Sequence, residues 1–242
     1  MLSYKNSQKE IAESGVDTVV IPLGSVEQHG SHLPIGTDCM TAQAIANGVA
    51  EHFGALVMPV LPISTCYEHM GKKGASFHMR PSTYYQMLQD IILCLRDQGF
   101  HRVFLVAGHG GIFISDPAVR ELNAKYDDLI VIKALPHTFT NMRDVIENTE
   151  PEIHAGESET SLLLHIDEAC VNKEEAKKND YQPAVPREFL NYMPIHTISP
   201  TGAWGKPSLA TKEKGEKLLK MRIDGCIKFI EEALKLATDK AW

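Results

Sequence analysis

Short apolar runs alternate with segments of helical periodicity along this chain. The runs are strand-sized and rich in β-branched residues, and they cover residues 16–23, 55–59, 101–107 and 129–134. Helical patterns cover residues 41–53, 82–98, 116–125, 157–168 and 212–236. Strands separated by helices in this way form a mostly parallel sheet with helices on both faces. We therefore predict an α/β fold.

Composition and charge narrow the choice of function. A chain of 242 residues that is 43% hydrophobic can bury one large core, so we assign residues 1–242 to a single domain. Its net charge of -7 and the lack of a clustered basic face argue against nucleic-acid binding. The five cysteines form no CxxC pair, and no apolar run is long enough to span a bilayer. We expect a cytoplasmic protein that is neither exported nor inserted in a membrane.

Polar residues suited to metal binding follow two of the predicted strands. Glu27, His29, His32 and Asp38 come after the first strand, and His109 directly follows the third. Carboxylates and imidazoles without thiolates suit Zn²⁺, Mn²⁺ or Fe²⁺ in a hydrolytic site. In open α/β sheets such ligands gather at the carboxyl ends of strands. On spacing alone, an ordinary polar loop, with His109 as a turn residue or phosphate contact, explains the pattern equally well.

Four motifs resemble those of the creatininase (creatinine amidohydrolase) family. They are IPLGSVEQHGSHLPIGTD at 21–38, GHGG at 108–111, HAGESETS at 154–161 and TGAWGKPSLATKEKG at 201–215. The resemblance implies a three-layer sandwich with two divalent metal ions, Zn²⁺, Mn²⁺ or Fe²⁺. It also implies that Glu27 and His109 hold one metal, that His29 holds the other, and that Asp38 bridges them.

One position departs from the creatininase pattern. Creatininase has a metal-ligating Glu two positions after the His of the second motif, whereas this chain has Gly111. Our candidate to replace that ligand is Glu159, although it could be an ordinary acid in the first turn of a helix. His154 matches the family's catalytic His, which passes a proton to the leaving nitrogen. The alternative is a loop histidine packed beside the helix start.

The resemblance also indicates residues that contact the substrate. Glu68, His69 and His78 lie in a loop that covers the site in the family. The neighbouring Lys72 and Lys73 are equally typical of a solvated loop.

The predicted function is hydrolysis of a C–N bond in a small amide, cyclic amide or formamide by a metal-activated water, with Glu159 and His154 in the catalytic set. The family resemblance also implies a homo-oligomer, commonly a hexamer. Creatinine itself is disfavoured because residues 135–154 contain no Trp to close over it. Opening of an oxidised sugar, inositol or lactone ring, and a non-catalytic binding protein, are the alternatives. A dehydrogenase is disfavoured because LGSVEQHG is not a GxGxxG turn.

Overall fold

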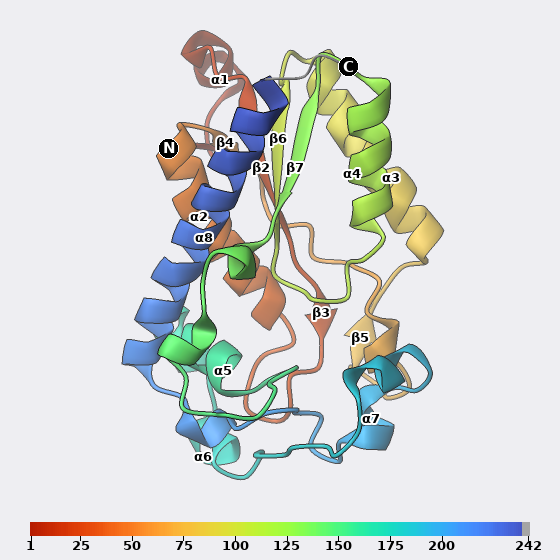
Figure 1. Ribbon diagram of the computed structural model, residues 1–242, viewed down its shortest axis with the longest axis vertical. Helices are drawn as coiled ribbons and strands as arrows, with labels where there is room; N and C mark the ends of the chain where they lie inside the picture. The colour runs from red at the N-terminus through yellow and green to blue at the C-terminus, as the bar shows by residue number, and fades with distance from the viewer. Residues whose placement is uncertain (239–242) are drawn as a thin grey trace.

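The central sheet has the parallel arrangement that the sequence predicts. The computed structural model describes residues 1–238, and residues 239–242, the last four of the predicted domain, lie outside them. Within the described residues five parallel strands lie side by side (Figure 1). Their order is β1 (Leu2–Ser3), β4 (Leu56–Val57), β2 (Thr18–Leu23), β6 (Arg102–Ala107) and β7 (Ile130–Ala134).

Helices cover both faces of this sheet, which gives three layers. Helices α2 (Thr37–Phe53) and α8 (Lys212–Thr238) pack on one face, and α3 (Pro81–Asp97) and α4 (Ser115–Lys125) on the other (Figure 1). Strand β2 feeds both cores, because Val19 faces α3 whereas Val20 faces α2. All six residues of β2 are buried, as expected for a strand covered on both sides.

Shorter elements surround the carboxyl edge of the sheet. Strands β3 (Val26–Glu27) and β5 (Ser76–Phe77) form an antiparallel pair. Helix α5 (Glu157–Ile166) packs against α8 and α2. The remaining helices are α1 (Gln8–Ser14), α6 (Lys173–Ala176), α7 (Ile195–Ile198), η1 (Tyr67–His69), η2 (Pro136–Thr138), η3 (Met142–Asp144), η4 (Glu168–Cys170), η5 (Arg187–Asn191) and η6 (Pro207–Leu209). Of the helices in the described part, none is long and apolar enough to cross a membrane.

Helix α2 begins earlier than the periodicity predicts. We expected a helix from residue 41, but α2 starts at Thr37. The preceding residue, Gly36, has no side chain that could cap the helix and so mark its start. Apolar spacing does not reveal this first turn, because Thr37 and Asp38 are polar. Asp38 therefore lies in the first turn of a helix rather than in a loop.

Strands β2 and β6 are neighbours where the winding of the sheet reverses. The chain leaves β2 through α2 to reach β4 on one side, and returns through α3 to β6 on the other. Leu23 and Ala107, the last residues of β2 and β6, pair in register. Such a switch point is where α/β proteins place their ligands. Glu27 and His109 follow these two strand ends.

Two glycines let the start of α2 approach these strand ends. A Cβ on Gly24 would lie 2.8 Å from the Cα of Cys39, and a Cβ on Gly108 would collide with the backbone oxygen of Asp38. Both positions need glycine because backbone, rather than a flexible side chain, lies opposite. The contact at Gly108 holds Asp38 beside His109.

Replacing Gly108 with alanine should push α2 away from β6. We expect Gly108→Ala to lower the free energy of unfolding by about 1–3 kcal/mol in urea titrations, because the new methyl group overpacks a fixed backbone contact. The control is Gly36→Ala, since a Cβ there meets nothing within 4 Å. That variant should lose less than about 1 kcal/mol. Equal losses for the two variants would contradict this account of Gly108.

Candidate metal centre

Five predicted site residues converge at the switch point from four segments of the chain. Glu27 ends β3, His29 follows it, Asp38 lies in the first turn of α2, His109 follows β6, and Glu159 lies in the first turn of α5. Glu27, His29, Asp38 and His109 are all buried. The side chain of Glu159 keeps 19% of its surface exposed.

Their donor atoms form two groups that share Asp38. In the first group, His109 Nδ1 lies 3.2 Å from Glu27 Oε1 and 3.3 Å from Asp38 Oδ2. In the second, His29 Nε2 lies 3.3 Å from Asp38 Oδ1 and 3.8 Å from Glu159 Oε2. The donor atoms within each group lie within 4.8 Å of one another. Asp38 thus presents one oxygen to each group.

Three buried donor atoms in these groups make no hydrogen bond. They are Glu27 Oε1, His29 Nε2 and Asp38 Oδ2. A buried polar atom without a partner costs about 1–3 kcal/mol, and more when it is charged. Divalent cations bound by both groups would satisfy all three atoms, and oxygen and imidazole donors suit such ions. A third group, Glu27 with His29 and His154, would compete for donors that the first two groups already use.

The electrostatics of the site reflect carboxylates and imidazoles held close together. Burial lowers the pKa of His29, but the charges of Asp38 and Glu159 outweigh it and raise that pKa to about 10. Burial raises the pKa of Glu27, yet the charges of His109 and His69 hold it well below its usual value. Without metal, protons on the imidazoles therefore balance the carboxylates.

The start of α5 is built to position Glu159. Ala155 has a φ of 49°, a left-handed conformation that is costly for a residue with a Cβ. In this conformation its N–H donates to Glu159 Oε2 at 2.6 Å. The carboxylate of Glu152 accepts from the backbone N–H of Ser158 at 2.9 Å and so caps the helix. These contacts aim Glu159 at the second group.

His154 is held in one orientation beside the first group. Its Nε2 lies 2.6 Å from the backbone oxygen of Gln28 and donates to it. The other ring nitrogen, Nδ1, then carries a lone pair and lies 3.8 Å from Glu27 Oε1. Burial, followed by the charges of His29 and His69, holds the pKa of His154 well below its usual value. His154 is therefore neutral.

The structure brings two of the three predicted substrate-contacting residues to the site. Glu68 Oε1 lies 3.3 Å from His109 Nε2, and His69 Nε2 lies 3.1 Å from Glu27 Oε1. His78 instead packs on the ring of Tyr67, with 4.1 Å between ring centroids, and lies outside the cavities at the site. A substrate role for His78 stays a prediction.

Glycine at position 111 fits this arrangement. A Cβ there would collide with Glu68 Oε1 and with His109 Nε2. The space that a side chain at 111 would need is therefore taken by the Glu68 carboxylate.

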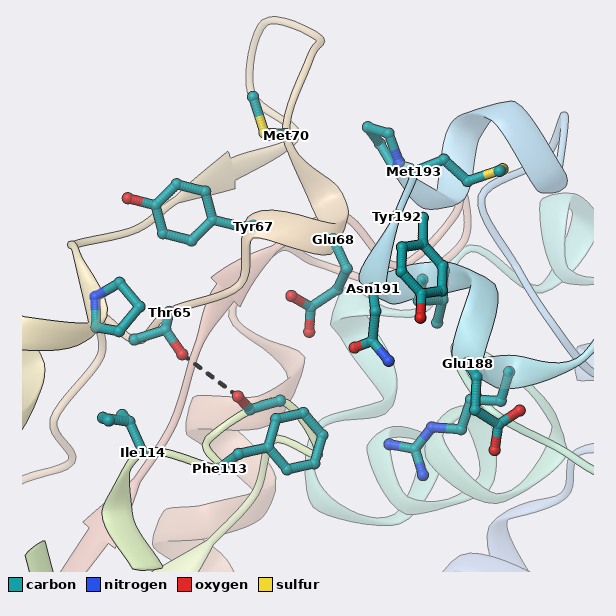
Figure 2. Close-up of a pocket in the computed structure, with 15 residues that line it drawn as sticks. Thr65, Tyr67, Glu68, Met70, Phe113, Ile114, Glu188, Asn191, Tyr192 and Met193 are labelled. Carbon is teal, nitrogen blue, oxygen red and sulfur yellow. Dashed lines mark hydrogen bonds between the residues drawn. The ribbon is translucent and has the colours of Figure 1, made fainter. Parts of the chain in front are cut away.

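Two large cavities adjoin the site. A cavity of about 730 Å³ has Glu68 on one side and Asn191 and Tyr192 on the other (Figure 2). A second cavity of about 330 Å³ is lined by His109, His154 and Glu159 together with two arginines.

Three polar residues near these side chains were not among those expected from the sequence, namely Gln28, Arg187 and Arg222. Gln28 lies inside the first motif, and Arg187 lies in a proline-rich stretch that carried no motif. Arg222 had a usable signal, because it shares a helical stripe with the buried residues Leu218 and Cys226.

Comparison with known proteins identifies the family. A family model for creatininase, described as creatinine amidohydrolase, matches residues 4–230. Creatinine amidohydrolase of Pseudomonas putida is 31% identical over an alignment 252 residues long, and the alignment covers 96% of this chain and 95% of that protein. A mycofactocin precursor peptide peptidase of Mycolicibacterium smegmatis is 30% identical over 230 residues, which cover 88% of this chain and 84% of that protein.

Solved structures agree with the sequence comparison. A crystal structure of creatinine amidohydrolase superposes with a TM-score of 0.81 at 25% identity and covers 96% of this chain and 97% of that one. Solved creatininases include a manganese form and a zinc–zinc form of a mutant, and the donor groups found here are consistent with divalent metals. The chain therefore belongs to the creatininase family.

Proposed function

We propose that this protein hydrolyses the C–N bond of an amide with a water activated by two divalent cations that Asp38 bridges. The observation that carries this proposal is the pair of donor groups sharing Asp38, with three buried donor atoms that lack a hydrogen-bond partner. When bound, two such cations supply a water of lowered pKa and polarise a carbonyl group.

The five converging side chains divide into two ligand sets in this proposal. Glu27, His109 and Oδ2 of Asp38 hold one cation, while His29, Glu159 and Oδ1 of Asp38 hold the other. A carboxylate suits the shared position because each oxygen offsets the charge of one ion. Glu159 replaces the carboxylate that creatininase has at the position of Gly111.

His154 is the proposed proton carrier. Gln28 fixes its Nε2–H, so Nδ1 takes up a proton and delivers it to the departing nitrogen. General acid catalysis of this kind contributes about 10²- to 10⁴-fold in rate. A neutral imidazole with its free nitrogen toward the ligands is the form that accepts the proton.

Small amides other than creatinine are the proposed substrates. Trp204 is buried and lines none of the three cavities at the site. The relatives named above act on different molecules, creatinine and a peptide precursor, which supports a shared C–N chemistry with different pockets.

A cytoplasmic location and a homo-oligomer are part of the proposal. The free cysteines fit a reducing compartment.

Replacing Asp38 should dismantle both cation positions. We expect Asp38→Asn to retain less than a tenth of the wild-type metal, measured by elemental analysis after gel filtration, because one substitution removes a charged ligand from both sets. His78→Gln is the control, since His78 lies outside the cluster, and it should keep both ions. Full metal content in Asp38→Asn would contradict the bridging role.

Replacing Glu159 should remove one cation and leave the other. In Glu159→Gln the amide oxygen can still accept from the Ala155 N–H, so α5 should keep its start while the second set loses its charge. We expect the bound metal to fall from two ions per chain to one by the same analysis. Two retained ions would show that Glu159 is not a ligand.

Zinc affinity should rise with pH. The pKa of His29 is raised to about 10 in the metal-free protein, so this imidazole is protonated at neutral pH and must release its proton to bind. Between pH 6 and 9 we expect the zinc association constant to increase about tenfold per pH unit for each proton released. Competition with a chromophoric chelator measures the constant, and an affinity independent of pH would refute the prediction.

A further inference from the structure

Three cavities meet at the metal centre and share lining residues. The smallest, of about 50 Å³, lies over the ligands Glu27, Asp38 and His109. The cavities of about 730 Å³ and 330 Å³ adjoin it and each share several lining residues with it. Arg187 lines all three cavities. A substrate whose scissile bond lies at the ligands would therefore extend past Arg187.

The guanidinium of Arg187 has no partner among the described residues. Arg187 begins η5, is exposed, and makes no hydrogen bond or ion pair within residues 1–238. A Cβ on Gly110 would lie 3.3 Å from its Nη2, so the absence of a side chain at 110 leaves room for this guanidinium beside His109. An unpaired guanidinium next to a catalytic cluster suits an anionic ligand, because its fork matches the two oxygens of a carboxylate.

A second arginine also lines the 330 Å³ cavity. Arg222 comes from α8, and its Nε is buried without a hydrogen-bond partner. Within residues 1–238 its one hydrogen bond is weak, from Nη2 to Met142 Sδ at 3.8 Å. A desolvated guanidinium with an unused donor is costly unless a partner arrives.

The acidic residues of this cavity are already engaged. Glu152 caps α5, and Glu159 accepts from Ala155 and faces His29. A third cation, Lys133, is paired with Asp116. Within residues 1–238 neither arginine forms an ion pair with these carboxylates, although the charges of Glu159 and Glu152 act on Arg222 at longer range. Both guanidiniums can therefore pair with a carboxylate of the ligand beside His154.

We propose that the 330 Å³ cavity is a carboxylate subsite, so that the preferred substrate is an amide with a carboxylate close to the scissile bond. The acyl side of that amide would extend into the 730 Å³ cavity, where Tyr67, Phe113 and Tyr192 offer aromatic surface (Figure 2). This inference rests on the proposed amide hydrolysis and adds a substrate class to it.

The test compares hippurate with hippuramide, its carboxamide, on the zinc-loaded protein. The two probes share a benzoyl group and an amide and differ in one charge. We expect kcat/KM for hippurate to exceed that for hippuramide by roughly tenfold or more, as for a hydrogen bond between charged groups. Arg187→Gln should bring the ratio toward one, and Arg222→Lys should lower it, because lysine keeps the charge without the fork. Arg120→Gln, an exposed arginine on α4 away from the cavities, should leave the ratio unchanged.

Calorimetric titration of both probes into zinc-free protein separates this inference from the proposed function. Without zinc, a preference for hippurate that Arg187→Gln abolishes assigns carboxylate binding to the arginine. Turnover of both amides at equal rates would overturn the subsite and leave the hydrolase standing. Charge-selective binding without turnover of either probe in the zinc-loaded protein would count against the hydrolase and support the subsite. Equal binding of the two probes without turnover would contradict both.

Discussion

The two oxygens of Asp38 face different imidazoles, and the rest of the site is arranged around that carboxylate. Oδ2 lies at 3.3 Å from His109, and Oδ1 lies at 3.3 Å from His29. This geometry requires the first turn of α2 to lie against the end of β6, which glycine at 108 permits. It also requires β2 and β6 to be neighbours, so that Glu27 and His109 emerge together. The order of the strands and the convergence of these side chains are therefore linked, because the second requires the first.

The buried charges of this site reduce the stability of the folded protein, and one backbone position near them is strained. Ala155 adopts an unfavourable left-handed conformation, and in that conformation its N–H donates a hydrogen bond to Glu159. Gln28 in turn fixes the orientation of His154 through its backbone oxygen. Groups held in this way reorganise little during a reaction, which is the main contribution a protein makes to electrostatic catalysis.

The sequence predicted most of the fold and the residues that converge at the site, for identifiable reasons. The β2 and β6 runs are apolar because helices cover both their faces, so periodicity found them easily. The sequence placed the start of α2 four residues too late, because Thr37 and Asp38 are polar and do not continue the apolar spacing of the helix. The Asp38 side chain points to the site and not to the hydrophobic core. Glu159 was suggested only by the family motif and the glycine at 111, and its role as a ligand stays a proposal. Arg187 could not be found, because its importance comes from cavities that form between segments distant in the chain.

Crystallographic anomalous scattering at the zinc absorption edge locates bound zinc ions directly. If Asp38 bridges two cations, the map will show two peaks per chain, each in contact with a different oxygen of Asp38, with His109 beside one and His29 beside the other. A single peak held by Glu27, His29 and His154, or no peak at Asp38 in zinc-saturated crystals, would rule out the bridging role of Asp38.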